Sequence, residues 1–238
     1  MTDAFESGTI AGNVRAVFDN IRRAAQRAGR SPDRVRLVAA TKSVPVDRIL
    51  QAVQAGISLL GENRLQEALP KVMAIGPRDG VSWHFIGQLQ RRKVKAVVGT
   101  FEMIHSVDSL GLAREIDRRA GEAGIRQAVL LEVNLAGETS KAGFAPSEVT
   151  DAVMVLDGLS NLDVQGLMTI PPPTKEAEEA RPYFRQLREL ARALASPTLR
   201  RVRLEELSMG MSHDYEVAVE EGTTLVRVGQ AIFGARHG

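Results

Sequence analysis

The stretch VRLVAATKSVPVDRILQAVQA, residues 35–55, contains the pattern that decides the fold. Residues 35–41 form a short, mostly apolar run, which is typical of a strand that is buried on both faces of a parallel sheet. Residues 46–55 instead carry apolar side chains at helical spacing, and Pro45 stands where a helix would begin. The stretch therefore predicts one β-strand that is followed directly by one α-helix.

The same unit recurs along the chain. We predict strands at residues 35–41, 57–61, 81–87, 101–107, 128–134, 162–169, 204–210 and 224–232. We predict helices at residues 8–29, 46–55, 65–74, 110–123, 146–156 and 177–195, with shorter helical segments after Gly87 and Gly210. Alternation of strands and helices implies a parallel sheet with right-handed crossovers.

Eight such units in 238 residues match a (β/α)8 TIM barrel, which typically takes roughly 250 residues. The helix at residues 8–29 precedes the first strand and is extra to that architecture. A doubly wound open sheet is the alternative, but residues 42–45 read KSVP where that fold usually carries a G-x-G-x-x-G turn. No linker or low-complexity run divides the chain, so we predict one α/β domain over residues 1–238.

The composition excludes several classes of protein. The chain has no cysteine, which removes disulfide scaffolds, cysteine-based zinc sites, iron–sulfur clusters and thiol nucleophiles. Its histidines form no metal-binding pair, its net charge is only +2, and its short basic run at residues 91–95 has no interleaved aromatic residues. No stretch approaches 18 consecutive apolar residues, and the N-terminus has no signal-peptide core. We therefore expect a cytoplasmic protein without a metal, nucleic-acid or membrane partner.

Polar residues follow the predicted strands, at the end of the barrel where active sites form. Lys42 is the sharpest of these features, because it alone among six lysines closes an apolar strand. Burial lowers the pKa of a lysine and frees its amine to attack an aldehyde, which gives a Schiff base. The alternative is a lysine whose stem lies along the strand end while its ammonium reaches solvent.

The loops after the seventh and eighth strands hold the usual phosphate site of this fold. Ser212 stands there at the start of a helical segment, where a hydroxyl and free N–H groups favour an anion. Gly229 allows the backbone to approach a ligand closely. The alternatives are that Ser212 caps its own helix and that Gly229 serves a turn.

Arg227 interrupts an otherwise apolar strand, LVRV at residues 225–228. An arginine is rarely buried in such a strand without a partner, so it either pairs with a carboxylate or faces a ligand. A lysine able to form a Schiff base, a phosphate site and an inward arginine together suggest pyridoxal 5'-phosphate (PLP) as the cofactor.

The sequence also resembles the pyridoxal phosphate homeostasis protein family, which is related to the N-terminal barrel of alanine racemase. The resemblance covers nearly the whole chain in one order, through LVAATK (37–42), GENRLQE (61–67), WHFIGQLQ (83–90), HSVD (105–108), residues 133–134, 141–143 and 166–168, and the runs 207–214 and 226–234. It implies a single barrel that holds PLP as an internal aldimine on Lys42. The resemblance further implies a set of cofactor-binding residues: the phosphate on Ser212, Gly229 and Gln230, the pyridine nitrogen against Arg227, and Asn63, Met168 and Ser208 lining or near the cofactor.

The function that the resemblance implies is intracellular PLP homeostasis, in which the protein buffers the cofactor and delivers it to PLP-dependent apoenzymes. No firm reaction is attached to the family, so we expect a carrier and not an enzyme, and we expect a monomer. Two positions depart from the family pattern: Val44 stands where a second lysine is common, and Arg92 replaces the usual asparagine. The roles of those two family residues are therefore not expected here, whereas Lys141 is kept.

The chemistry of the predicted site agrees with a carrier. A cation at the pyridine nitrogen disfavours ring protonation, and an unprotonated ring is a poorer electron sink. Racemisation would need two placed bases, and the only tyrosines, Tyr183 and Tyr215, lie in predicted helices. A PLP-dependent racemase of low activity and a cofactor-free Schiff-base aldolase acting on a sugar phosphate remain open as alternatives.

Two buried histidines complete the predictions. His84 and His105 stand in predicted strands, where hydrogen-bonded core residues are commoner than acid–base groups. Asp108 follows the strand that contains His105 and could orient that histidine or cap the next helix.

Overall fold

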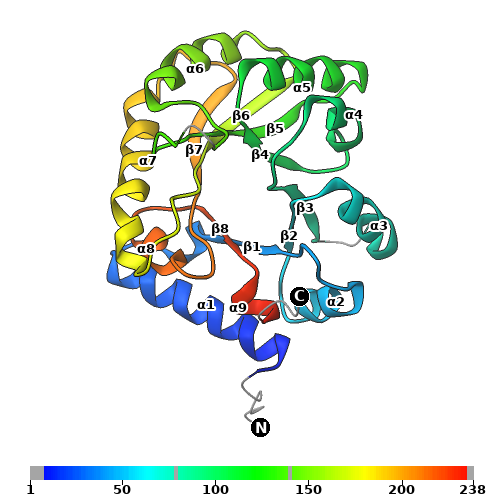
Figure 1. Cartoon of the computed structure of the whole chain (residues 1–238), viewed down its shortest axis with the longest axis vertical. Helices are drawn as coiled ribbons and strands as arrows, with labels where there is room; N and C mark the ends of the chain where they lie inside the picture. The colour runs from blue at the N-terminus through cyan, green and yellow to red at the C-terminus, as the bar shows by residue number, and fades with distance from the viewer. Residues whose placement is uncertain (1–7, 78–79, 139–140, 235–238) are drawn as a thin grey trace.

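The computed structural model describes residues 8–77, 80–138 and 141–234. Its strands form one closed, all-parallel barrel in chain order, which confirms the predicted TIM barrel (Figure 1). The barrel closes because β1 pairs with β2 along one edge and with β8 along the other. The strands are β1 (Arg36–Ala40), β2 (Leu59–Glu62), β3 (Ser82–Phe85), β4 (Met103–Val107), β5 (Gln127–Glu132), β6 (Leu162–Met168), β7 (Val202–Ser208) and β8 (Leu225–Val228).

Helices surround the strands, as Figure 1 shows. They are α1 (Ile10–Arg27), α2 (Val46–Gln54), α3 (Leu65–Ile75), α4 (Val94–Val97), α5 (Leu110–Glu122), α6 (Val149–Asp157), α7 (Arg181–Leu194), α8 (Tyr215–Glu220) and α9 (Gln230–Phe233), with 3-10 turns η1 (Pro32–Arg34), η2 (Arg91–Lys93), η3 (Pro146–Glu148) and η4 (Ala177–Ala180). The segments after Gly87 and Gly210 are the short helices that the sequence predicts, α4 and α8. Among the helices described, none is both long and apolar enough to cross a membrane.

The extra N-terminal helix α1 packs on the outside of the barrel against α2, α8 and α9. Its helical spacing places Val14, Val17 and Ile21 on one face, and all three are buried. Polar contacts fix its position: the Asn13 side-chain amide donates to the Ile232 carbonyl over 2.9 Å. Helix α1 therefore covers the side of the barrel that carries α8, α9 and α2.

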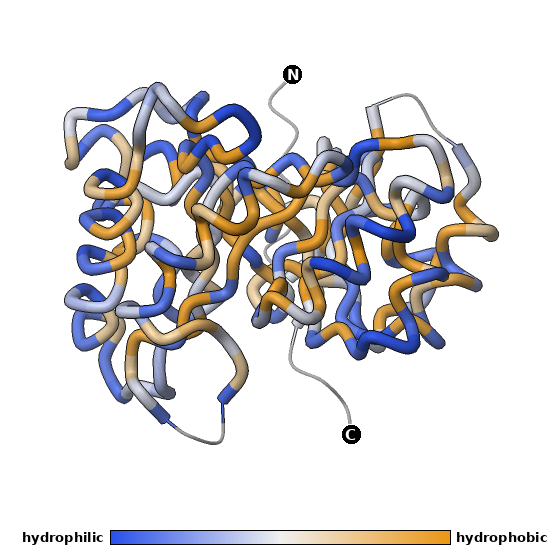
Figure 2. Tube along the Cα trace, turned by 90° about the horizontal axis from the view of Figure 1, so that it is seen from above, coloured by the Kyte–Doolittle hydropathy of each residue, from blue (hydrophilic) through white to orange (hydrophobic). Residues whose placement is uncertain are grey.

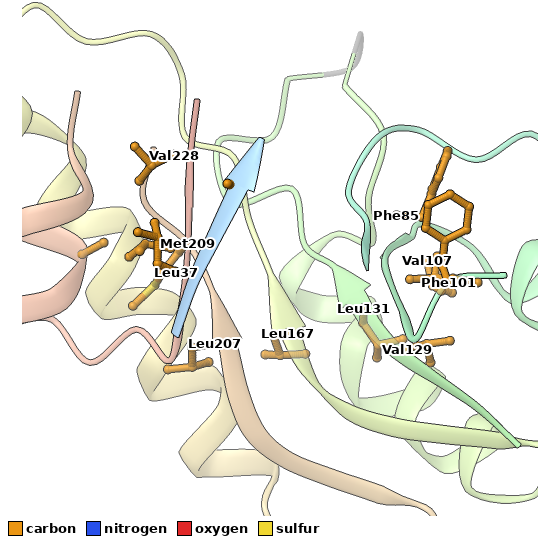
Figure 3. Close-up of a cluster of buried hydrophobic side chains, with 14 of the residues drawn as sticks. Leu37, Phe85, Phe101, Val107, Val129, Leu131, Leu167, Leu207, Met209 and Val228 are labelled. Carbon is orange, nitrogen blue, oxygen red and sulfur yellow. The ribbon is translucent and has the colours of Figure 1, made fainter. Parts of the chain in front are cut away.

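Two apolar layers hold the fold together, because side chains in a barrel strand alternate between the interior and the helices. In β1, Leu37 and Ala39 join the large cluster beneath the helices, and Val38 joins the smaller cluster inside the barrel. Figure 3 shows part of the large cluster, including the edge-on contact of Phe85 with Phe101, whose ring centroids lie 5.4 Å apart. The hydrophilic stretches gather on the outer turns of the helices, as Figure 2 shows. Continued alternation along β1 makes Ala40 and then Lys42 inward positions.

The last predicted strand, residues 224–232, is too long. The strand ends at Val228, and residues 230–233 form the helix α9. Gly229 interrupts the strand because its backbone lies against β1: a Cβ placed there would be 3.0 Å from the Ala40 carbonyl oxygen. The apolar side chains after that glycine continue the hydrophobic pattern of the strand, so periodicity alone does not separate the two elements.

The expectation for Asp108 is wrong in both of its forms. Ser109, not Asp108, caps α5, since its hydroxyl accepts a hydrogen bond from the Leu112 N–H over 3.3 Å. His105 is hydrogen-bonded to His84 and Ser208. The Asp108 carboxylate instead accepts a hydrogen bond from the Ser109 hydroxyl.

Candidate functional site

A pocket of about 360 Å³ opens at the carboxyl ends of β1 and β8 and contains most of the predicted site. Its size lies within the range of small-molecule and cofactor sites. It brings together six of the eight predicted residues: Lys42, Asn63, Ser212, Arg227, Gly229 and Gln230. Apolar side chains, among them Val44, Ile86 and Phe233, form its walls.

Lys42 is half-buried, and the backbone on both sides of it is held in place. On one side, the Thr41 N–H donates to the Gly61 carbonyl over 2.9 Å, which extends the pairing of β1 with β2. On the other side, Ser43 adopts the left-handed conformation with φ 60°, and its N–H donates to the Glu67 carboxylate over 2.9 Å. A non-glycine residue in this conformation is uncommon and requires such support. The turn therefore presents the lysine amine to the pocket from a fixed backbone.

A second lysine lies close to Lys42, and sequence reasoning did not find it. The Lys71 ammonium in α3 donates to the Thr41 carbonyl over 2.7 Å and to the Glu62 carboxylate over 2.6 Å. Glu62 is completely buried and also accepts a hydrogen bond from the Thr41 hydroxyl over 2.7 Å. Because Glu62 faces the helices, this buried ion pair lies behind the strand end and holds the residue that precedes Lys42.

Ser212 does not cap its own helix, so that alternative is wrong: the residue that precedes α8 is Asp214. The Ser212 hydroxyl oxygen instead accepts hydrogen bonds from the Gly229 N–H over 3.3 Å and from the Ala231 N–H over 3.2 Å. The seventh and eighth βα loops are thereby joined at the edge of the pocket. Because both N–H groups donate to the Ser212 oxygen, the hydroxyl proton of Ser212 is a donor that this turn can offer to an anion.

Arg227 lies inside the barrel, beside Val38 of the interior cluster, and only 5 % of it is exposed. It donates to the Ser208 hydroxyl oxygen over 2.5 Å and to the Thr169 carbonyl over 2.9 Å. Within the described part of the chain no carboxylate forms an ion pair with it. Burial lowers the pKa of its guanidinium to about 10, although Glu132 raises it, so the group is charged at neutral pH. The first sequence alternative, a carboxylate pair, is therefore absent there, and the cation faces the pocket.

Met168 and Ser208 lie outside the pocket that holds the other six predicted residues. Met168 is 1 % exposed and lines an adjoining hollow of about 320 Å³. Ser208 is fully buried beneath Arg227. The hollow and the pocket share Asn63 and two isoleucines, so they form neighbouring parts of one mouth.

Glu132 in the adjoining hollow is a further residue that sequence reasoning missed. Burial raises the pKa of its carboxyl to about 7, the Asp108 carboxylate adds to that rise, and Arg227 opposes it. The available signal was its position: Glu132 follows the apolar run of β5 at an inward place. Among the described residues, no cluster of three or more metal-ligating side chains accompanies it.

The two positions that depart from the family pattern differ in their relation to the pocket. Val44 is buried and forms part of the wall near Lys42. Arg92 is exposed in η2, and its guanidinium donates to the side chain of Gln90 over 3.1 Å. The first departure changes the lining from a cation to an apolar surface, whereas the second lies on the surface.

Comparison with known proteins gives a consistent set of relatives. The family described as alanine racemase, N-terminal domain, matches residues 13–237. A protein of Aquifex aeolicus that is named pyridoxal phosphate homeostasis protein is 46% identical over 220 residues, which are 92% of this chain and 95% of that protein. The protein of the same name from Escherichia coli K12 is 39% identical, over 95% of this chain and 97% of its own length.

Solved structures agree with these relatives. The structure of PipY from Synechococcus elongatus PCC7942 with PLP bound is 38% identical, covers 90% of this chain and 100% of its own, and has a TM-score of 0.79. A protein from Bifidobacterium adolescentis, described as unknown, is 39% identical over 94% of both chains with a TM-score of 0.89. An alanine racemase of Clostridium difficile is only 16% identical at a TM-score of 0.67, which is a likeness of fold.

Proposed function

The chain belongs to the pyridoxal phosphate homeostasis protein family, with the alanine racemase N-terminal fold, and on that premise we propose that it binds PLP as a cofactor carrier. One observation carries the proposal: a single pocket unites a lysine amine, a turn of donors and a buried arginine cation without a carboxylate partner among the described residues. These are the three groups that an aldehyde, a phosphate and a pyridine nitrogen require.

We assign the covalent link to Lys42. Its amine would hold the cofactor as an internal aldimine, because a lysine amine can form a Schiff base with an aldehyde. The fixed strand end on which Lys42 stands supports this role, because the amine then approaches from one direction. The bond is reversible by water or by another amine, as delivery of the cofactor requires.

We assign the phosphate to the turn formed by Ser212, Gly229 and Gln230, at the edge of the same pocket. Arg227 would face the pyridine nitrogen as a hydrogen-bond donor, and its charge would disfavour protonation of that nitrogen, since a second positive charge beside a cation is unfavourable. Asn63 lines the cofactor directly, Met168 borders it from the adjoining hollow, and Ser208 acts through Arg227.

The biological role that we propose is PLP homeostasis within the cytoplasm: a monomer, folded as a single domain over residues 1–238, buffers PLP and gives it to PLP-dependent apoenzymes. Transfer is tested by placing the PLP-loaded protein with such an apoenzyme, and recovery of the apoenzyme's activity is followed against free PLP at the same concentration. Recovery no faster than hydrolytic release of PLP into solution contradicts direct delivery.

Binding is tested by titrating PLP into the wild-type protein and into two variants while the visible absorption of the imine is recorded. Lys42→Ala removes the proposed amine, and Lys93→Ala removes a lysine outside the pocket as a matched control. We expect the imine band in the wild type and the control and its absence in Lys42→Ala. An equal band in all three proteins contradicts the assignment to Lys42.

Glu132 favours one second candidate, a PLP-dependent racemase-like enzyme of low activity. A carboxyl with a pKa near 7 is suited to move protons at neutral pH, and it lies in the hollow beside the pocket. The two tyrosines offer no alternative base: Tyr215 accepts a hydrogen bond from Asn20 of α1, and Tyr183 does not line the pocket. Sustained change in the chirality of a single L-amino acid, abolished by Lys42→Ala and by Glu132→Gln, establishes the enzyme over the carrier.

A further inference from the structure

The interior of the barrel contains a line of polar side chains where bulky branched residues usually pack. Arg227 of β8, Ser208 of β7, His105 of β4 and His84 of β3 are each at most 5 % exposed. Their strand partners in the register include Val38, Met168 and Met103, which belong to the interior cluster. Buried polar groups are unfavourable unless they are hydrogen-bonded, so the arrangement requires an explanation.

These four side chains form one continuous chain of hydrogen bonds across the barrel. Arg227 and the Ser208 hydroxyl are 2.5 Å apart, the same hydroxyl is 2.9 Å from His105 Nδ1, and His105 Nε2 is 2.9 Å from His84 Nδ1. The two imidazole rings lie at an angle of 55° with centroids 5.0 Å apart. Side chains from four separate strands are thus connected in a single line.

One direction gives the hydroxyl proton and the ring proton of His105 an acceptor within the line. A guanidinium cannot accept, so Arg227 donates and the Ser208 oxygen accepts. The Ser208 oxygen can accept two hydrogen bonds, but the hydroxyl proton has an acceptor in the line only when it is directed to His105 Nδ1. That direction places the ring proton of His105 on Nε2. That proton is donated to His84 Nδ1, which places the proton of His84 on Nε2. His84 Nε2 has no hydrogen-bond partner among the described residues, so the line ends there.

The direction requires both histidines to be neutral, and their surroundings agree. Burial lowers the pKa of His84 to about 4; Arg36 lowers it further, and Glu102 and Glu206 oppose the shift. Burial also lowers the pKa of His105 well below its ordinary value, and the neighbouring His84, Arg227 and Arg36 each lower it further. At neutral pH the line therefore carries one positive charge, at the end that faces the pocket.

We propose that His105 and Ser208 are positioning residues that hold the Arg227 guanidinium in one orientation at the floor of the cofactor pocket, with His84 as the anchor of the line. The inference rests on the proposed function, because Arg227 acts on PLP only if the pocket binds it. While the Ser208 proton is directed to His105, a lone pair of the hydroxyl oxygen is held toward Arg227. Without His105, nothing in the line fixes the rotation of the hydroxyl, so the geometry of its bond to the guanidinium is no longer fixed.

Spectroscopy of the PLP-loaded protein tests the proposal with three variants. Ser208→Ala removes the acceptor, His105→Leu removes the ring, and His105→Gln restores an acceptor and a donor in one side chain. Met103→Leu is the control, since it changes an interior side chain of the same strand that is outside the line. The readouts are the PLP dissociation constant, the pH midpoint of the visible imine band and the thermal midpoint of unfolding.

We expect Ser208→Ala and His105→Leu to raise the dissociation constant about tenfold and to move the pH midpoint of the band, which corresponds to the loss of one hydrogen bond to a charged group. His105→Gln and Met103→Leu retain wild-type values for both. If His105→Leu does not fold, Ser208→Ala decides the question, because it removes one oxygen and adds no volume.

The outcomes separate the two proposals. A wild-type protein that forms no visible band contradicts the proposed function itself. A wild-type band together with an unchanged dissociation constant and pH midpoint in Ser208→Ala overturns the positioning role and leaves PLP binding intact. Loss of thermal stability alone, with both PLP readouts unchanged, also overturns the positioning role, because a purely structural line would behave in that way.

Discussion

Substitution of Lys71 by methionine is expected to destabilise the protein far more than the loss of an ordinary lysine on a helix. The Lys71 side chain is only 12% exposed and that of its partner Glu62 is 0% exposed, with the two atoms 2.6 Å apart. Lys71→Met has a similar length and removes only the charge and the donors. The Glu62 carboxylate then keeps the Thr41 hydroxyl as its one hydrogen-bond donor in the described structure, because its second oxygen already has none.

The size of the effect follows from the burial of the pair. Removal of one partner from a buried ion pair is strongly destabilising, by about 3–5 kcal/mol in the free energy of unfolding. For a domain of this size that corresponds to a fall of roughly 6–20 °C in the thermal midpoint.

The assay is urea unfolding of the apoprotein, compared with Arg22→Met as the control. Arg22 pairs with Asp19 on the surface, where both side chains are about half exposed (56%/44%), and its loss is worth about 0–1 kcal/mol. The double variant Lys71→Met/Glu62→Gln is expected to recover part of the loss, because it leaves no unpaired charge. If Lys71→Met falls within the range of the surface control, the pair does not hold the strand end and the reasoning is refuted.

Three further changes give predictions of different kinds. Gly166→Ala should prevent close pairing of β6 with β7, because its Cβ would lie 1.8 Å from the Glu206 carbonyl oxygen. We expect the free energy of unfolding, measured in urea, to fall by more than about 3 kcal/mol. A near-neutral effect contradicts the register of the two strands. His84 has a folded pKa of about 4, below its unfolded value, so its neutral burial contributes stability that is present above pH ~6.5 and is lost as the pH falls toward 4, by about 3 kcal/mol in all. His84→Gln should flatten that part of the pH–stability profile, and an unaltered slope counts against neutral burial. Ser212→Ala removes the acceptor of the Gly229 N–H and the hydroxyl of the proposed phosphate turn. We expect PLP to bind about tenfold more weakly, and free pyridoxal, which lacks the phosphate, to bind as before. Equal weakening of both ligands would place the phosphate elsewhere.

The barrel and the position of Lys42 at its mouth follow from local patterns in the sequence. Apolar runs and helical spacing predict all eight strands, and Lys42 is found because it ends the first of them. Ser212 and Gly229 are found because their loops follow the last two strands. Their placement around one pocket could be predicted because it depends on residues that are adjacent in the chain and on the one rule that parallel strands end at the same mouth.

The remaining features depend on contacts between distant parts of the chain. In the sequence, Lys71 is indistinguishable from an ordinary lysine of an amphipathic helix. Only the packing of α3 over the end of β2 brings its ammonium to Glu62. Similarly, the buried line behind Arg227 requires the register of four strands, because His105 and Ser208 are 103 residues apart in the sequence. No local sequence pattern predicts contacts between such distant residues. The Lys71–Glu62 pair and the hydrogen-bonded line behind Arg227 are therefore visible only in the folded structure.

Borohydride reduction of the PLP-loaded protein, followed by peptide mass mapping, tests whether Lys42 forms the proposed imine with PLP. Reduction converts the imine to a stable secondary amine and fixes the cofactor to the nitrogen that carried it. We expect one cofactor adduct per chain, on the peptide that contains Lys42, with Lys71 and Lys141 unmodified. An adduct mainly on another lysine, or no adduct in a protein that retains its visible band, contradicts the account.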